Sequence, residues 1–337
     1  MTDTPTFKEY HLRSRPNDMP TIDNFELHEL PLPILKDGEV KVRNLWMSVD
    51  PYMRGRMRPG KSYAARYEVG EVMHGGAIGI VEESRSPEFI KGAIVRSMCG
   101  WREAFVASAS ALSTIPEDLG PPEAHLGALG MPGLTAYYGL FEIAKLKPGE
   151  RVFVSAAAGA VGSMVCQIAK SIGCVVIGSA GSDEKCTWLR DILGVDATIN
   201  YRMSTDLSAA IEQAAPDGID VYFENVGGEH FAAALGNMAE KGRIVACGMI
   251  AAYNDTGVQA LKVDLSPIVV KSLRIEGFIA TQHYDFYPAF YDFVRPLLAA
   301  GNLHWQQTIS VGIESAPNAF LGLFSGVNKG KMLVKLG

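Results

Sequence analysis

Three small residues at a fixed spacing lie between a short apolar run and a helical pattern. Residues 151–170 contain Ala157, Gly159 and Gly162 at the spacing of the G-x-G-x-x-G fingerprint, with alanine in place of the first glycine. Such residues permit a tight turn, the approach of the backbone to a diphosphate, and close packing of the helix on the strand. The first amides of the helix have no intrahelical acceptors, and its dipole favours an anion. The stretch therefore predicts a dinucleotide-binding turn.

The same stretch has a second interpretation, because residues 152–169 carry no charge. A run of about 18 such residues approaches the length of a membrane span. Ser, Gly and Gln interrupt the run, and Arg151 and Lys170 bound it closely. We therefore favour strand, turn and helix, and we expect no membrane association.

The end of the second apolar run indicates which dinucleotide binds. Domains that prefer NAD place Asp or Glu there, about 20 residues beyond the fingerprint, to hold the ribose hydroxyls. Here residues 178–181 are Gly, Ser, Ala and Gly. The missing acid removes repulsion against a 2′-phosphate, and Lys185 on the next helix supplies a positive charge. This pattern predicts NADPH, although Lys185 can also be interpreted as one more solvated helix residue.

Strand-like runs follow the fingerprint and alternate with helical patterns. The runs are residues 175–178, 197–200, 221–224, 243–247 and 273–277, and the helical patterns include 185–193 and 229–238. This alternation predicts an α/β fold with a parallel sheet wound on both faces. Ligands bind such sheets beyond the carboxyl ends of their strands.

The first part of the chain, residues 1–129, has a different pattern. Residues 39–45 alternate apolar and charged side chains, and further strand-like runs lie within 72–81 and at 93–96. This part is predicted to be mostly β.

The remaining boundaries follow from breaks in these patterns. Prolines and glycines at 116–133 precede a helical pattern at 135–144, so we place the boundary near residue 130. A helical stretch at 286–300 ends at Gly301, and residues 316–335 read as helix, turn and strand. The predicted units are 1–129, 130–300, and a return of 301–337 to the first domain.

Length and charge exclude several classes of protein. The chain has 337 residues, a length that suits two domains. Its net charge of −6 leaves no basic patch for binding nucleic acid. The first residues lack the apolar core of a signal peptide, so we expect a cytoplasmic protein. Five scattered cysteines are neither a disulfide framework nor a structural zinc lobe, and most are predicted to be small buried hydrophobes.

Several motifs in a fixed order resemble one family. They are VDPYMRGRM at 49–57, GMPGLTAY at 130–137, AAAGAVG at 156–162, AGSDEK at 180–185, ENVGG at 224–228 and CGMIAAYN at 247–254. From about residue 8 to its end, the chain resembles the zinc-independent alkenal and prostaglandin reductase branch of the medium-chain dehydrogenase/reductase superfamily. Ser-Tyr at 62–63, Val-Gly at 69–70 and Gly-Gly at 75–76 resemble the NADPH-dependent curcumin reductases in particular.

The resemblance implies a fold and a reaction. The fold is a GroES-like, mostly-β catalytic domain followed by an NADP-binding Rossmann domain with a doubly wound parallel sheet, and the family is dimeric. In the reaction, NADPH gives a hydride to the β-carbon of an α,β-unsaturated ketone or aldehyde. Two alternatives remain open: an NADPH:quinone oxidoreductase of the same superfamily, and a non-catalytic NADPH-binding protein.

The resemblance also implies cofactor-binding residues. The residues of the glycine turn bind the diphosphate, and Lys185 and Tyr201 contact the adenosine 2′-phosphate. The remaining residues of the set line the nicotinamide cleft. The full set is Gly159, Ala160, Val161, Gly162, Lys185, Tyr201, Asn225, Cys247, Gly248, Met249, Ile250, Tyr253, Phe278, Ile279, Ala280 and Asn328.

The motifs single out three tyrosines, Tyr52, Tyr63 and Tyr253, as candidate catalytic residues. Hydride arrival at the β-carbon pushes charge onto the carbonyl oxygen, so a hydrogen-bond donor is needed there. Our hypothesis is that Tyr63, Tyr253 or a ribose hydroxyl held by Tyr253 supplies it. The alternative is that each tyrosine is a packing residue with one bonded hydroxyl. Arg54 and Arg56 either orient a polar substrate or are solvated.

No metal is expected. Zinc-dependent relatives carry Gly-His-Glu before a Gly-Ala-Gly-Ile-Val stretch, and the matching positions here hold Gly75 and Gly76. His74 falls one place early and has no nearby cysteine partner, so it is interpreted as a structural or surface histidine.

Overall fold

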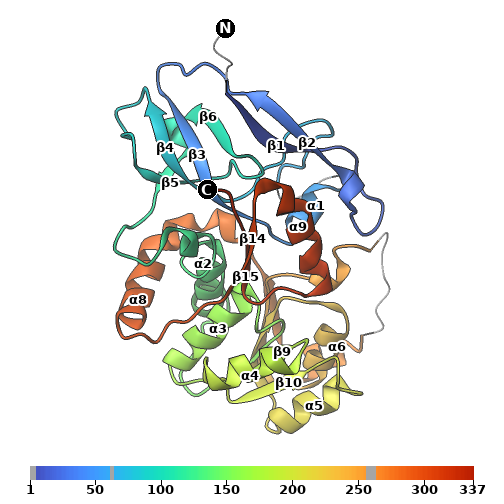
Figure 1. The fold of residues 1–337 in the computed structure, drawn as a ribbon. Coiled ribbons are helices and arrows are strands. Elements are labelled where there is room, and N and C mark those ends of the chain that lie inside the picture. The colour runs from blue at the N-terminus through green and yellow to red at the C-terminus, as the bar shows by residue number, and fades with distance from the viewer. Residues whose placement is uncertain (1–4, 61–63, 256–262) are drawn as a thin grey trace.

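The computed structural model describes residues 5–60, 64–255 and 263–337. In Figure 1 the six-stranded sheet lies in the lower part, and the amino-terminal part of the chain, with the seven-stranded sheet, lies at the top. The last segment of the chain, in red, runs from the lower part back to the upper one. This arrangement separates a first, amino-terminal part from the part that carries the glycine turn.

The upper part is mostly β, as predicted. The hairpin β1 (Thr6–Leu12) and β2 (Phe25–Pro31) is antiparallel. The larger sheet has the order β14-β15-β3-β4-β5-β7, and β6 also pairs with β3. Its bounds are β3 (Glu39–Ser48), β4 (Ala77–Ser84), β5 (Ile94–Ser97), β6 (Ala104–Ser108) and β7 (Ser113–Thr114).

The alternating pattern at 39–45 places apolar side chains in the core and charged ones toward solvent, as expected. Val40 and Val42 are buried, whereas Arg43 between Val42 and Asn44 is exposed. The valines pack with Val81 and Phe105 in the core of this part. Strand β3 is followed by the short helix α1 (Met53–Arg56), which lies within the 49–57 motif.

The lower sheet has the order β10-β9-β8-β11-β12-β13, and every adjacent pair is parallel. Numbered along the chain, this is the doubly wound order 3-2-1-4-5-6. The bounds are β8 (Arg151–Val154), β9 (Val175–Ala180), β10 (Ala197–Asn200), β11 (Ile219–Glu224), β12 (Met238–Ala246) and β13 (Arg274–Gly277). The prediction of a parallel sheet is confirmed. One boundary was wrong, because Met238 begins β12 instead of ending a helix.

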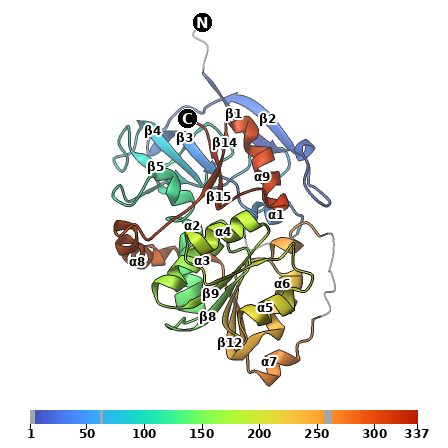
Figure 2. The ribbon, with the colours of Figure 1, turned by 60° about the horizontal axis from the view of Figure 1, so that its bottom comes forward.

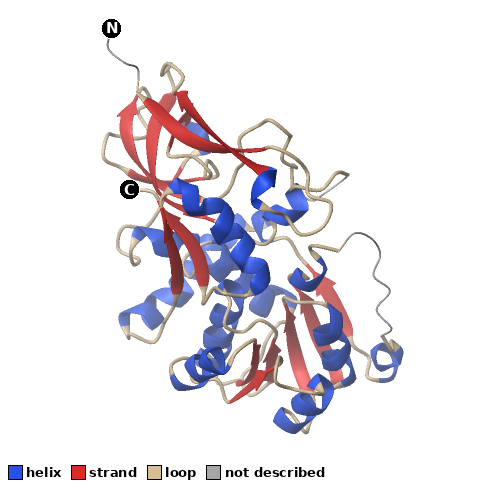
Figure 3. Cartoon of the chain, turned by 45° about the vertical axis from the view of Figure 1, so that its right-hand side comes forward, coloured by secondary structure: helices blue, strands red, loops and turns tan. Residues whose placement is uncertain are grey.

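Helices cover both faces of this sheet (Figures 2 and 3). One core holds side chains from α2 (Met131–Tyr138), α3 (Ala160–Ser171), α4 (Asp183–Asp191) and α8 (Tyr287–Ala299). A second core holds side chains from α5 (Leu207–Ala214) and α6 (Gly228–Gly236), with α7 (Ser266–Val270) at its margin. The uncharged stretch 152–169 therefore forms a core strand, a turn and a helix. Within the described ranges, the protein has no helix with the length and apolar character of a membrane span.

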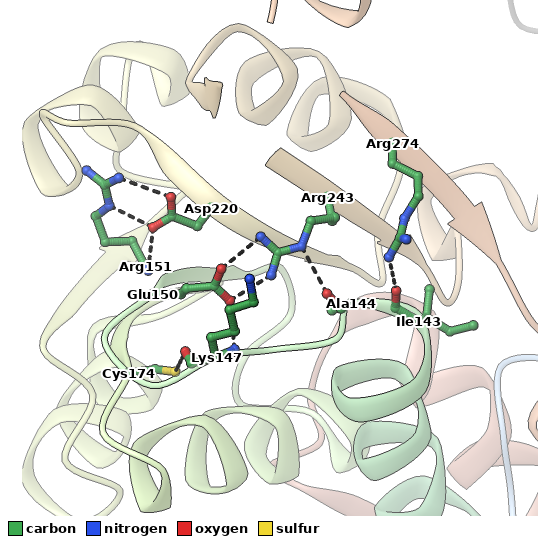
Figure 4. Close-up of polar contacts among 9 residues, drawn as sticks. All are labelled: Ile143, Ala144, Lys147, Glu150, Arg151, Cys174, Asp220, Arg243 and Arg274. Atoms are coloured by element: carbon green, nitrogen blue, oxygen red, sulfur yellow. Dashed lines mark hydrogen bonds and ion pairs between the residues drawn. The ribbon is translucent and has the colours of Figure 1, made fainter. Parts of the chain in front are cut away.

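Charged pairs join the elements at the amino-terminal edge of this sheet (Figure 4). The guanidinium of Arg151 donates to Asp220 at 2.9 and 3.1 Å. That of Arg243 donates to Glu150 at 2.6 and 2.9 Å and to the carbonyl of Ala144 at 2.9 Å. The first pair joins β8 to β11, and the contacts of Arg243 join β12 to the segment that precedes β8.

The end of the chain contributes to the upper sheet. After α9 (Ala316–Ser325), strand β15 (Lys331–Lys335) pairs antiparallel with β3. Strand β14 (Gln307–Val311), which the sequence did not suggest, pairs parallel with β15. The units 1–129, 130–300 and 301–337 remain our proposal for the domain limits.

Candidate functional site

The glycine turn lies between β8 and α3, as the spacing predicted. Gly159 is the residue before the first turn of α3. A Cβ atom at Gly162 would lie 2.4 Å from the carbonyl oxygen of Ala156 and 2.8 Å from Cα of Ala157, so only glycine permits this approach. A Cβ atom at Gly159 would meet only that same oxygen, at 3.1 Å. The space beside Gly159 and the free amides that begin α3 fit the diphosphate of a dinucleotide.

The turn contains a strained residue. Ala156 has a φ of +49°, in the left-handed region that side chains disfavour. The N–H of Ala157 donates to the carbonyl of Ser179 at 2.9 Å, and that of Gly159 donates to Ala156 at 2.9 Å. These bonds hold the turn in one conformation.

The carboxyl end of β11 positions the next part of the site. Glu224 is fully buried, accepting from Ser155 Oγ at 2.9 Å and from the N–H of Val226 at 2.6 Å. The side chain of Asn225 donates to the carbonyl of Ser155 at 2.8 Å. This network fixes Asn225 beside the glycine turn.

The loop after β12 folds back over Asn225. The N–H of Ile250 donates to the carbonyl of Asn225 at 3.2 Å. A Cβ atom at Gly248 would lie 3.3 Å from Oη of Tyr253 and 3.4 Å from the Asn225 carbonyl. The structure therefore brings together Asn225, Gly248, Ile250 and Tyr253, with the exposed Met249 beside them.

Tyr253 and Cys247 are uncharged members of this loop. The Tyr253 hydroxyl accepts from the N–H of Met249 at 3.5 Å. Burial raises the pKa of the Tyr253 phenol above its usual value, so the hydroxyl stays protonated and is able to donate. Burial, with a smaller contribution from Glu224, raises the pKa of the Cys247 thiol to about 12. Cys247 is therefore an uncharged residue of the site.

Three cations, Lys185, Arg202 and Lys329, form what we call the cation group. Lys185 Nζ donates to the carbonyl of Gly326 at 2.8 Å, and Arg202 Nη2 donates to the carbonyl of Ser325 at 3.2 Å. Lys329 is ion-paired with Glu184. Burial lowers the pKa of the partly buried Lys185, and Arg202 and Lys329 lower it further by repulsion.

Tyr201 lies close to the cation group. Its hydroxyl is 2.9 Å from where a Cβ atom at Gly181 would stand, and its ring packs edge-on against His230 at 4.9 Å. A phosphate would compensate the repulsion among the cations, which fits the 2′-phosphate of NADPH. The sequence analysis missed Arg202 and Lys329, although they adjoin the predicted residues Tyr201 and Asn328.

Residues 325–331, which we call the return segment, lie against the glycine turn. The N–H of Gly330 donates to the carbonyl of Ala158 at 2.9 Å, and Asn328 Nδ2 donates to Gly330 at 3.0 Å. The next residue, Lys331, is buried and pairs with Asp50 at 3.1 Å, just before Tyr52. The return segment thus connects the turn to the 49–57 motif.

The predicted catalytic tyrosines differ in their placement. Tyr52 precedes α1 and is partly buried. Burial raises its pKa well above the usual value, and Asp50 adds to this effect. Tyr63 lies outside the described residues.

The two arginines of the same motif are buried, so their interpretation as solvated residues was wrong. Arg54 is 0% exposed and Arg56 is 9% exposed. Arg56 Nε donates to the carbonyl of Ala65 at 2.6 Å, and its guanidinium lies 4.1 Å from the ring centre of Tyr67. Arg54 donates to the carbonyl of Asp18 at 2.6 Å and to Asn254 Oδ1 at 3.0 Å.

Phe278, Ile279 and Ala280 follow the carboxyl end of β13, and all three are partly buried. The ring of Phe278 lies 5.4 Å from that of Tyr138 and packs against the core. Phe278 therefore has a packing role, and its place at the nicotinamide cleft stays a prediction.

At the two positions where zinc-dependent relatives carry ligands, this chain has Gly75 and Gly76. A Cβ atom at Gly75 would lie 2.4 Å from Cε of Met53. His74 is partly buried, with Nδ1 3.1 Å from Arg102 Nη2. Burial, helped by Arg102, lowers the pKa of His74 to about 4, consistent with a structural role. Among the described residues, no three His, Cys, Asp or Glu side chains gather closely enough to hold a metal ion.

Two family models match the chain. Residues 8–115 match the N-terminal domain of oxidoreductase, and residues 160–295 match the model described as zinc-binding dehydrogenase. The second match begins with α3 and includes strands β9 to β13 of the parallel sheet.

Curated proteins and solved structures match nearly the whole chain. The chain is 44% identical over 299 residues to a 2-alkenal reductase (NADP(+)-dependent) of Nicotiana tabacum, with 88% of this chain and 87% of that protein covered. It is 37% identical to the NADPH-dependent curcumin reductase of Escherichia coli, covering 98% and 96%. The crystal structure of CurA in complex with NADPH from Vibrio vulnificus superposes with a TM-score of 0.93 at 39% identity, covering 98% and 99%.

Proposed function

We propose that this chain, which belongs to the zinc-independent alkenal and prostaglandin reductase branch of the medium-chain dehydrogenase/reductase superfamily, reduces the C=C bond of α,β-unsaturated ketones and aldehydes with NADPH. One observation supports the site: the amino end of α3, the residues Lys185 and Arg202, and the loop that carries Tyr253 follow the carboxyl ends of the parallel strands β8, β9, β10 and β12. They therefore lie at one edge of the sheet, where such folds bind ligands.

When bound, NADPH supplies a hydride to the β-carbon, and an electron pair moves onto the carbonyl oxygen as an enolate. The enolate then takes a proton at its α-carbon, so that one hydride and one proton are added in all. The chain must place a donor at the oxygen, because stabilisation of a developing oxyanion is usually the largest catalytic contribution. The phenols of Tyr52 and Tyr253 are both protonated at neutral pH and so act as donors, not as bases.

Substitution of single hydroxyls tests this assignment. Tyr253→Phe and Tyr63→Phe keep the rings, and kcat should be measured at saturating NADPH with a good enone. We expect at least one variant to lose about 10²-fold to 10³-fold in kcat while it still binds NADPH. If both turn over like the parent, neither hydroxyl is the essential donor.

A substrate panel separates the alternatives. NADPH oxidation should be followed with enones, 2-alkenals and quinones. Turnover of quinones alone would favour an NADPH:quinone oxidoreductase, and NADPH binding without any turnover would favour a non-catalytic protein. Exhaustive chelation, checked by elemental analysis, should leave enone reduction intact, because glycines occupy the ligand positions. Loss of activity restored by zinc alone would contradict this.

We also propose that the protein is a cytoplasmic homodimer. All residues of the edge strand β13 are exposed, and its backbone edge continues the sheet. Nearby, Val269 and Val270 are 80% and 78% exposed, and Leu265 is 58% exposed. A second copy pairing along β13 would cover these side chains. Sedimentation of the protein and of its Ile275→Arg variant tests the proposal, and a monomeric parent would contradict it.

A further inference from the structure

Two arginines of the upper part bind the loop that carries Tyr253. Arg54 Nε donates to Asn254 Oδ1 at 3.0 Å, and Arg58 Nη2 donates to the carbonyl of Asp255 at 2.5 Å. The partners are 200 and 197 residues apart in the chain. The α1 turn and the loop after β12 are therefore tied at two adjacent residues.

The spacing of the arginines explains how both reach the same loop. Arg54 and Arg58 are four residues apart, which places them on one face of a helical turn. The N–H of Met57 donates to the carbonyl of Met53 at 3.2 Å, and that of Arg58 donates to Gly55 at 3.3 Å, so the turn continues beyond α1. Two contacts on one face fix both the separation and the angle between α1 and the loop.

A contribution to stability does not by itself explain why Arg54 is buried. Its side chain is fully buried, and within the described part of the chain its Nη1 has no hydrogen-bond partner. Burial and the nearby Arg58 lower its pKa to about 10, so it remains charged at neutral pH. A buried charge with an unsatisfied donor is weak evidence for a stabilising role and is consistent with a positional one.

We propose that Arg54 and Arg58 are positioning residues that hold Tyr253 at the substrate, across the cleft from Tyr52. This inference rests on the proposed function. Tyr52 directly precedes α1, and Tyr253 directly precedes Asn254. The same turn thus carries one candidate tyrosine and grips the loop that carries the other. Because a displacement of about 1 Å costs about 10²-fold in rate, this contact sets the rate of hydride transfer.

The test removes the contact at its less buried residues, Asn254 and Arg58, and leaves the fully buried Arg54 in place. Asn254→Ala deletes the acceptor of Arg54, and Arg58→Met deletes the second bond but keeps an aliphatic side chain. Asn254→Asp retains an acceptor and serves as the conservative rescue. As a matched control, Asp118→Ala removes an exposed ion pair with Arg295, whose partners are 177 residues apart.

Four quantities should be measured for each variant: kcat with a good enone, the NADPH dissociation constant, the urea midpoint, and the kinetic isotope effect with NADPH deuterated at the transferred position. We expect kcat of Asn254→Ala and Arg58→Met to fall by about 10-fold or more. NADPH affinity and the urea midpoint should stay near those of the parent. The kinetic isotope effect should be at least as large as that of the parent. Asn254→Asp should recover most of kcat, and Asp118→Ala should match the parent.

The outcomes separate this inference from the proposed function. If the parent reduces no enone, the proposed function fails. If the parent is active and kcat of both Asn254→Ala and Arg58→Met stays within twofold, the positioning role is refuted. A loss of kcat that follows a matching loss of NADPH affinity or of stability also refutes it, because the contact would then be merely structural.

Discussion

The two edges of the parallel sheet use charged side chains in opposite ways. At the amino-terminal edge, Arg151 and Arg243 each meet a carboxylate (Figure 4). At the carboxyl-terminal edge, Lys185 and Arg202 donate to backbone carbonyls of the return segment, and Glu184 pairs with Lys329. The first edge is electrostatically matched, whereas the second carries an excess of positive charge.

This difference separates structure from function in one sheet. Matched, partly buried pairs stabilise the folded chain, because loss of one partner leaves an uncompensated charge. The cations of the second edge repel one another, since Arg202 and Lys329 add to the effect of burial in lowering the pKa of Lys185. We infer that the amino-terminal edge contributes stability and that the carboxyl-terminal edge contributes affinity for the phosphates of NADPH.

The largest effect is expected at the glycine turn. Gly162→Ala should lower the free energy of unfolding by about 3 kcal/mol and abolish NADPH binding, because the methyl group would overlap Ala156. Gly159→Ala is the matched control, since its methyl group would contact only the Ala156 oxygen. The control should weaken NADPH binding with a much smaller loss of stability. Urea unfolding and fluorescence titration measure both quantities. A Gly162→Ala protein as stable as the parent would contradict this packing.

The next effect tests the amino-terminal edge. Glu150→Gln should lower the free energy of unfolding by about 2 kcal/mol, because Arg243 would lose its charge partner in a partly buried site. The NADPH dissociation constant should not change. An unchanged urea midpoint, or a weaker affinity for NADPH, would remove the distinction between the edges.

The third effect tests the carboxyl-terminal edge. Lys185→Ala should raise the NADPH dissociation constant by about 10-fold, since a charge-assisted phosphate contact contributes about 1 to 3 kcal/mol. The NADH dissociation constant and the urea midpoint should change little. Equal weakening of NADPH and NADH would show that Lys185 does not meet the 2′-phosphate.

The smallest effect is expected for Arg202, whose side chain is exposed. Arg202→Gln should weaken NADPH binding by about threefold, because exposed ion pairs contribute about 0.2 to 1 kcal/mol. Salt should reduce the difference between parent and variant, since it screens exposed charges. A loss as large as that of Lys185→Ala would mean that Arg202 becomes buried against the phosphate.

Local sequence was sufficient for much of the fold. The small residues at 157, 159 and 162 and the periodicity around them determine a strand, a turn and a helix, because each depends on near neighbours. The parallel pairing of strands β8 to β13 followed from their repeated alternation with helices. Lys185 was identified as the positive residue on the helix after the missing acid and within the motif at 180–185, and it lies among further cations.

Pairings between distant segments were not visible in the sequence. Strand β14 is short and half-exposed, and its parallel pairing with β15 depends on how the chain end meets β3. Met238 continued a helical pattern but begins β12, because its partner Ile219 on β11 is a tertiary neighbour. Tertiary pairing overrides local periodicity at such boundaries.

The sequence by itself determined the nucleotide-binding turn, the absence of an acid after β9, and the family resemblance, since all three reside in contiguous residues. Only the tertiary structure decided which surfaces meet: the return segment with the glycine turn, Lys331 with Asp50, and Arg54 with Asn254. Each of these contacts joins segments more than 100 residues apart. Their geometry follows from how segments distant along the chain pack together, which no local pattern of residues encodes.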